Sequence, residues 1–312
     1  MARFIAWRTL GILPILTVTL VITFFSIYAL PGDPVLVMLG DRASDVETST
    51  QLRRQYGLDQ PLVMQFFDYA TGVLTGNFGL SFRFIGTPVS ELIGEALLIS
   101  PLLAVAAMSV GLPVGAVAGT VAAIQRGRVA DFLIMLLMVV GLSVPSFALA
   151  TGLMYLLSVQ LGLLPVAGWG TLSQMVLPVM VLAVPGAAYT ARMTRTLMLE
   201  VMQNDFIRTA RAKGLSRLVV IWRHGFPNTL VPQFTSAGVM LGALISNAFV
   251  VEIVFNIPGL GRLAIEAVFA RDYPVTMAVV LLFMAFFLVI SLCVDVAYAL
   301  VDPRVRERVT NG

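Results

Sequence analysis

One polar segment, residues 205–232, concentrates side chains that could bind a charged partner. It reads DFIRTARAKGLSRLVVIWRHGFPNTLVP and holds the only lysine of the chain, Lys213, its only histidine, His224, and four of its arginines. A histidine with no second histidine or cysteine nearby does not form the usual zinc ligand sets or a nucleophile–base pair. The side chains of this segment therefore favour recognition of a partner through positive charge, and we expect neither an enzyme nor a metal site.

ATP hydrolysis by this chain is excluded by the position of Lys213. A phosphate-binding loop needs a glycine followed by a lysine and then by serine or threonine. Lys213 follows Ala212 and precedes Gly214, and no Gly-Lys pair occurs in the sequence. Purified alone, the chain should neither bind nor hydrolyse ATP.

Local signals divide the polar segment into a helix, a turn and a second helix. Asp205 can begin the first helix, and Gly214 favours the left-handed conformation that ends one. Ser216 can cap the second helix, which continues towards Pro227. A basic helix pair on anionic lipid would explain the charge, but not the order of these glycine and proline positions. The apolar face expected for the first helix consists of Phe206, Ile207 and Ala210.

The rest of the chain has the composition of an integral membrane protein. Of its 312 residues 58% are apolar and 12% are charged, with a mean hydropathy of +0.93, whereas about 25% are charged in soluble domains. The first apolar stretch is too long for a signal peptide, so we expect an uncleaved helix. Stretches of about 20 apolar residues predict six membrane-spanning helices. They are centred on residues 8–30, 97–124, 132–159, 175–191, 230–257 and 275–301.

Lysine and arginine positions set the expected topology. Of the 20 basic residues, 14 share a side with the N-terminus, which predicts a cytoplasmic location for both termini and for the polar segment. The domain organisation expected is one transmembrane domain over residues 1–312. Its parts are the first helix (8–30), an outer loop with short helices (31–96), a five-helix core (97–301), a cytoplasmic loop within it (192–229) and a cytoplasmic tail (302–312).

The outer loop is too long to lack structure. A capping-box pattern from Ser44 to Glu47 predicts a helix that ends near Gly57, and Pro61 can begin a second, amphipathic helix. The apolar face of that second helix consists of Val63, Phe66, Phe67, Ala70, Val73 and Leu74.

Small residues four positions apart mark two of the predicted spans. Such stripes let helix backbones approach closely in a membrane, so both helices are expected at the packed centre. Pro113 and Pro145 should bend their helices. The stripes are Gly111, Gly115 and Gly119 in one span and Gly238, Gly242 and Ser246 in the other.

Two acidic residues lie in or near the spans. Glu252 and Asp295 are weak candidates for the substrate pathway, because an ionisable residue within a membrane is often functional. Both lie close to a predicted helix end, where a carboxylate can instead reach water or an arginine.

The polar segment resembles the EAA loop of permease subunits of ABC importers. That loop reads Glu-Ala-Ala, three residues, Gly, nine residues and Ile-x-Leu-Pro. Here the same register gives Arg208-Thr209-Ala210, Gly214, and Pro227 thirteen positions after the glycine. The first acidic residue is missing, and His224-Gly225-Phe226 replaces Ile-x-Leu. RTARAKGLS followed by RHGFPNTLVP is similar to the variant found in the dipeptide, oligopeptide and nickel branch.

The resemblance to the first permease subunit of that branch extends over nearly the whole chain. It includes LPGDP at 30–34, YGLDQPL at 56–62, GNFGLSFR with PVSELI at 76–93, PGLGRL at 258–263, ARDYPV at 270–275 and VDPRVR at 301–306.

The resemblance implies an all-helical type I importer permease in the inner membrane of a prokaryote. It implies four kinds of partner: a second permease subunit, two cytoplasmic ATPase subunits that bind ATP and Mg, an external substrate-binding protein, and the lipid bilayer, with no nucleic acid. Small side chains at Ala210 and Ala212 would let the coupling helix approach an ATPase closely. The implied ATPase-coupling residues are Asp205, Phe206, Arg208, Thr209, Ala210, Ala212, Lys213, Gly214, Leu215 and Pro227.

The sequence does not identify the transported substrate. A di- or oligopeptide is favoured, and nickel or another small solute is the alternative within the family. A channel or sensor without ATPase partners is the alternative from a different class. A membrane enzyme is disfavoured because no acid–base or nucleophile constellation is present.

Overall fold

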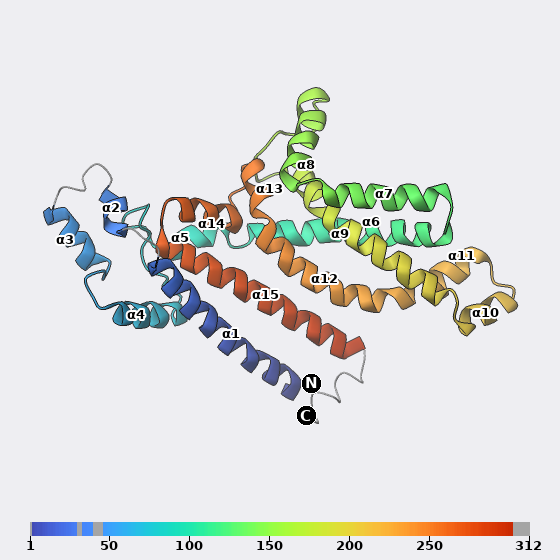
Figure 1. The fold of residues 1–312 in the computed structure, drawn as a ribbon, viewed down its shortest axis with the longest axis horizontal. Coiled ribbons are helices and arrows are strands. Elements are labelled where there is room, and N and C mark those ends of the chain that lie inside the picture. Colours follow the sequence, from blue (N-terminus) through green and yellow to red (C-terminus); the bar gives the residue numbers. More distant parts are fainter. Residues whose placement is uncertain (1, 30–32, 40–45, 302–312) are drawn as a thin grey trace. The chain divides into compact units, whose positions relative to one another are not determined.

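The computed structural model describes residues 2–29, 33–39 and 46–301, which form helices joined by turns (Figure 1). Within these residues no strand occurs beyond an isolated bridge between Leu80 and Pro88. The predicted all-helical fold is thus confirmed for the described chain. Two compact units are present: the first takes in the described residues of 1–5, 101–257 and 289–312, and the second those of 6–100 and 258–288.

The helices that could cross a membrane correspond to most of the predicted spans. Four are long and apolar enough, and they are Ala6–Tyr28, Val89–Ile124, Leu172–Val201 and Tyr273–Val296. A fifth results if α7 (Val129–Ser143) and the helical stretch Ser146–Gln160, bent by 104° after it, are counted as one span. Pro145 lies at this break, which confirms the bend predicted there.

The predicted span over residues 230–257 is divided between two helices. These are α12 (Pro227–Asn247) and α13 (Phe249–Val254), and neither passes as a full-length span by itself. The expectation of six spans therefore stays a prediction. The stretch after Pro145 is also composite, with α8 (Ser146–Leu153) followed by the π-helical η2 (Met154–Gln160).

In the first unit, α9 (Leu172–Val201) is the central helix, in contact with α7, α8 and α12. The glycine stripe of α6 (Ile99–Ile124) lies against its backbone. A methyl group on Gly111 would come within 2.7 Å of the Ala183 carbonyl oxygen, and methyl groups on Gly115 and Gly119 would clash with the carbonyls of Ala187 and Ala191. The glycines of α6 and the alanines of α9, both four residues apart, thus fit together. This permits close helix contact where lipid gives no drive for association.

The second predicted stripe has a different neighbour. Gly238 lies against Val294 of α15 (Tyr273–Val301), so any added methyl group would overlap that side chain. Gly242 is buried, and the side chain of Ser246 lies outside the described part of the structure. The glycines of α6 therefore pack on α9, a helix that the small-residue pattern alone does not single out.

The second unit contains α1 (Ala2–Tyr28) from Ala6 onward, α2 (Pro34–Leu39), α3 (Val46–Gln55), α4 (Leu62–Leu74), α5 (Val89–Ala96), α14 (Leu260–Phe269) and the beginning of α15. Helices α3 and α4 confirm the two short helices predicted in the outer loop, and Gly57 has the expected left-handed φ of +65°. Ser44 lies outside the described residues. On the predicted apolar face of α4, Phe66 packs against Phe24, whereas Val63 and Phe67 are exposed.

Candidate coupling surface and its supporting contacts

The predicted helix, turn and helix are present in residues 205–226, here called the coupling segment. It consists of α10 (Asp205–Ala212), the short α11 (Arg217–Val219) and the π-helical η3 (Val220–Gly225), all beyond the end of α9 (Figure 1). Gly214 adopts a φ of +76°, which confirms the predicted left-handed end of the first helix. A methyl group there would meet nothing within 4 Å, so the backbone dihedral, and not crowding within the chain, favours glycine.

The inner face of the coupling segment is apolar and buried. Ile207, Ala210 and Val220 form a cluster with Met202, which follows α9. Beside it, Ile221 packs with Met198 of α9. Burial of these side chains fixes which face of α10 points outward.

This packing corrects the expectation that Ala210 is open to a partner. Ala210 is only 6% exposed and contacts its own chain, whereas Ala212 is exposed. A larger residue at position 210 would first disturb the contact with Val220 inside the segment. Close approach of a partner to a small side chain is thus possible at Ala212 and not at Ala210.

The outer face of the coupling segment is basic and exposed. Arg208 forms an ion pair with Asp205 at 3.3 Å, and both side chains remain largely exposed. Arg217 donates a hydrogen bond to the Ile124 carbonyl oxygen at 3.4 Å. Among the described residues, no acidic side chain lies within ion-pair distance of the three remaining basic ones, which are Arg211, Lys213 and Arg223.

The other predicted coupling residues share this exposed face. Thr209 donates its hydroxyl to the Asp205 carbonyl at 3.0 Å, and Pro227 occupies the first turn of α12. Large apolar side chains lie among the charges, a composition typical of a protein contact surface. Those exposed here are Phe206, Leu215, Leu218, Val219 and Trp222.

An ion pair that the sequence analysis did not anticipate supports the helix leading into the coupling segment. Arg195 of α9 binds both carboxylate oxygens of Asp131 of α7, with distances of 2.7 Å each. The Gly127 amide donates to the same carboxylate at 3.0 Å. Asp131 is buried, so removing its charge would leave the arginine without its partner. No local pattern signals this contact, because 64 residues separate its members.

The two weak pathway candidates lie in different surroundings. Glu252 is fully buried in α13, and Asp295 is half-buried in α15. Neither lines the apolar groove of about 500 Å³ that α6 and α12 form in the first unit. In that groove the polar residue Gln233 is buried and donates a hydrogen bond to Thr229 at 2.9 Å.

In the second unit, motifs far apart in the sequence meet at one buried carboxylate. Asp272, from ARDYPV, accepts a short hydrogen bond from the Ser81 hydroxyl and further bonds from the amides of Phe82 at 3.1 Å and Arg83 at 3.2 Å. Those three partners belong to GNFGLSFR. It also accepts from the Val275 amide at 3.4 Å, in the first turn of α15. The carboxylate therefore joins a loop to a helix N-terminus.

Further polar contacts in the second unit involve three more of the motifs. Arg53 binds Asp33 of LPGDP, and the Tyr56 hydroxyl of YGLDQPL donates to the Ser81 carbonyl at 3.2 Å. The Leu260 amide of PGLGRL donates to the Ser100 hydroxyl at 2.9 Å. Five of the motifs that carried the resemblance thus take part in polar contacts of the second unit, whereas residues 302–306 of VDPRVR lie outside the described residues.

Comparison with protein families agrees with this architecture. The model described as "Binding-protein-dependent transport system inner membrane component" matches residues 111–307, and the corresponding N-terminal model matches residues 1–88. The chain belongs to this family. It is a permease subunit of an ABC importer located in the inner membrane, and it is not itself the ATPase.

Individual relatives show which permeases of this family the chain is similar to. The chain is 42% identical over 308 residues to the glutathione transport system permease protein GsiC of Salmonella typhimurium, covering 99% of this chain and 100% of the relative. It is 40% identical to GsiC of Escherichia coli strain K12 over the same shares. A chain of the MetNI methionine ABC transporter in an inward-facing conformation is similar in structure, with a TM-score of 0.54, 19% identity, and coverage of 69% of this chain and 96% of that one. This likeness supports the type I permease fold.

Proposed function

We propose that the chain forms half of the translocation pathway of a peptide importer and receives ATPase motion through the coupling segment. The observation that carries this proposal is the exposed basic face of that segment, held by a buried apolar underside and ended at a left-handed glycine. In a family of importer permeases, such a preformed surface beyond α9 is the candidate ATPase contact. Cationic side chains without acidic partners favour an acidic cleft.

The proposed assembly has four further parts. A second, similar permease would complete the pathway, two ATPase subunits would bind ATP and Mg on the cytoplasmic side, and a substrate-binding protein would deliver cargo outside. The exposed apolar side chains of α7 suit lipid or a helix of the second permease. In the topology we propose, both termini and the coupling segment lie in the cytoplasm and residues 31–96 lie outside.

Labelling tests this topology. Single cysteines at Asp59 and at Arg306, in a background lacking Cys293, should react with impermeant reagents from opposite sides of the membrane. Reaction from the same side would contradict the placement. Expression level of each variant controls for failed insertion.

A pair of substitutions at Gly214 tests the coupling role. Valine disfavours a positive φ at a cost of about 1–3 kcal/mol, whereas asparagine tolerates it better. The surrounding space is open, so both side chains fit within the chain. We expect Gly214→Val to insert normally but to reduce ATPase association or substrate-stimulated hydrolysis, and Gly214→Asn to retain most activity. Wild-type assembly and transport by Gly214→Val would refute the coupling proposal.

Peptide cargo is supported by the GsiC relatives, which are named for glutathione transport, since glutathione is itself a small peptide. Nickel or another small solute remains the alternative. Identifying the partner binding protein and analysing its co-purified ligand by mass spectrometry would decide between them. A glutathione or dipeptide ligand supports the proposal, and a bound metal ion contradicts it.

A further inference from the structure

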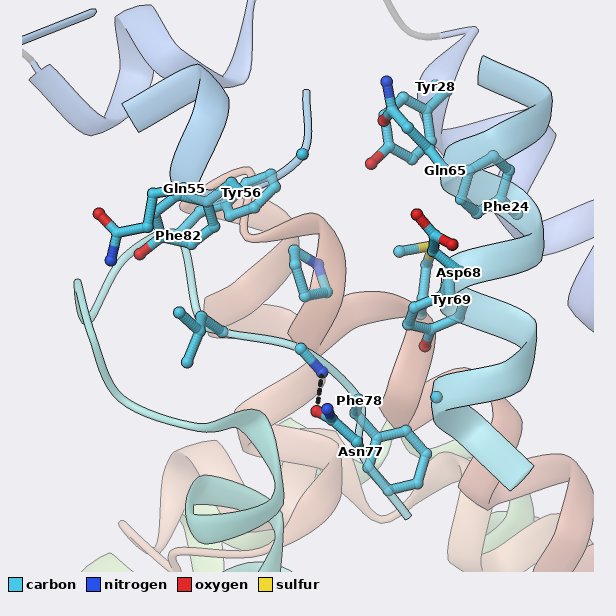
Figure 2. Close-up of a pocket in the computed structure, with 16 residues that line it drawn as sticks. Phe24, Tyr28, Gln55, Tyr56, Gln65, Asp68, Tyr69, Asn77, Phe78 and Phe82 are labelled. Atoms are coloured by element: carbon cyan, nitrogen blue, oxygen red, sulfur yellow. Dashed lines mark hydrogen bonds between the residues drawn. The ribbon is translucent and has the colours of Figure 1, made fainter. Parts of the chain in front are cut away.

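A cavity of about 250 Å³ in the second unit has no assigned role. Figure 2 shows Asp68 and Tyr69 of α4 on one wall, Tyr56 and Phe82 on the other, and Asn77 below. The cavity is smaller than the pockets of about 300–1,000 Å³ that hold drug-sized ligands. Its walls include six aromatic side chains, namely Phe24, Tyr28, Tyr56, Tyr69, Phe78 and Phe82.

Two buried polar atoms on the wall formed by α4 have no hydrogen-bond partner in the described chain. They are the Gln65 side-chain oxygen and the Tyr69 hydroxyl. The Gln65 amide nitrogen donates to the Gln60 carbonyl at 2.8 Å, which leaves the oxygen as the free acceptor. Buried polar groups normally have partners, so two orphans in one cavity indicate a missing ligand or ordered water.

The Tyr69 hydroxyl stays neutral over the physiological pH range. Burial, and after it the neighbouring Tyr28, raises its pKa above the ordinary value of 10.0. A neutral hydroxyl keeps lone pairs that can accept a hydrogen bond.

The charge of the cavity has one sign. Among the described residues that line the cavity, the exposed Asp68 is the only ionisable one other than tyrosine, and none is a lysine, arginine or histidine. Of the arginines within two residues of the lining in the sequence, Arg53 and Arg83 are engaged with Asp33 and Glu266, and Arg54 is exposed. No ion pair involving Asp68 occurs among the described residues. The Asp68 carboxylate would repel an anionic ligand, and no cation among the described lining residues would offset that repulsion.

The acceptors on α4 favour one kind of cation. Gln65 lies three residues before Asp68 and four before Tyr69, so its side chain neighbours both along the helix, and all three residues line the cavity. Figure 2 shows Asp68 between Gln65 and the Tyr69 hydroxyl. A primary ammonium group has three N–H donors, so it can donate to the Asp68 carboxylate and also to a neighbouring acceptor or to water. Aromatic faces add attraction for a cation. We propose that this cavity binds the primary ammonium group of a small organic amine.

Ligand titrations on the full chain in nanodiscs of zwitterionic lipid test the proposal. Saturation-transfer NMR would compare n-propylammonium with its isosteres propionate and 1-propanol, and empty nanodiscs would provide the blank. We expect saturable binding of the ammonium compound, no binding of propionate, and at least about tenfold weaker binding of tetramethylammonium, which has no N–H donor. Equal binding of propionate or of tetramethylammonium would overturn it.

Variants separate ligand binding from a structural role. Asp68→Asn should weaken n-propylammonium binding by about tenfold or more, whereas Asp59→Asn, an exposed residue outside the cavity, should not change it. Tyr69→Phe should weaken binding several-fold, yet leave the thermal midpoint unchanged or raised, because the lost hydroxyl has no partner. Wild-type affinity in both Asp68→Asn and Tyr69→Phe would refute the site. The assay needs no ATPase, so its result is independent of the proposed coupling role.

Discussion

The coupling segment and the second unit treat their charged side chains in opposite ways. In the coupling segment one apolar face is buried underneath, and the basic side chains remain exposed with few acidic neighbours. In the second unit Asp33, Glu266 and Asp272 are bound by arginines, a serine hydroxyl or backbone amides of the same unit. Charge that is neutralised internally serves the fold, whereas charge left without a partner is available for another molecule.

Removing one aspartate from each region gives the largest expected difference. Asp272→Ala leaves the Ser81 hydroxyl and three amides without their acceptor, so the second unit should lose at least about 3 kcal/mol of unfolding free energy. Asp205→Ala removes an exposed pair and should change stability by less than about 0.5 kcal/mol. Tryptophan fluorescence during thermal unfolding would measure both. Equal losses would contradict the contrast between the regions.

The ion pair between α7 and α9 offers a second test. Asp131→Asn should destabilise the first unit by roughly 3 kcal/mol, because Arg195 then loses its buried anionic partner. Since α9 leads into the coupling segment, substrate should also stimulate the ATPase activity of the assembled importer less than in the wild type. Asp131→Asn combined with Arg195→Met should recover part of the stability. No recovery in the double variant would argue against the pair as the cause.

Neutralising the exposed cations should affect assembly more than folding. Replacing Arg211, Lys213 and Arg223 together by glutamine should shift the unfolding free energy by less than about 0.5 kcal/mol, as is usual for surface changes. The affinity for the ATPase subunits should fall, and the affinity of the wild type should fall with rising salt. Unchanged affinity at low salt would show that the basic face contacts lipid or water instead. Surface plasmon resonance with immobilised ATPase subunits would measure the affinity of the variant and of the wild type for them.

The smallest effect concerns Glu266. The hydrogen bond from Arg262 at 2.7 Å, helped by Arg83, lowers the pKa of this carboxyl below its ordinary value of 4.5 despite partial burial. A lowered folded-state pKa adds stability above about pH 4.5 that disappears as the pH falls through the folded-state pKa. The thermal midpoints of Glu266→Gln and the wild type should therefore differ slightly at pH 7 and converge in acid. A constant difference would contradict the assignment.

The sequence alone determined the features that depend on neighbouring residues. Continuous apolar stretches located most of the helices, Pro145 located the break, and Gly214 located the left-handed end of α10. The class of protein also followed from the sequence, because the motif order extends along the chain. These features depend on local backbone preferences and on the length of apolar runs, and both follow directly from the order of residues along the chain.

Tertiary structure alone decided which residues meet. The coupling role implied by the resemblance predicted an open Ala210, but packing against Val220 buried it. The Asp131–Arg195 pair and the contact of Ser81 with Asp272 join residues 64 and 191 positions apart, and the glycines of α6 pack on α9. The cavity lined by Gln65, Asp68 and Tyr69 likewise requires α1, α4 and α15 together. Such contacts depend on the path of the chain between distant residues, which helix periodicity and local motifs do not specify.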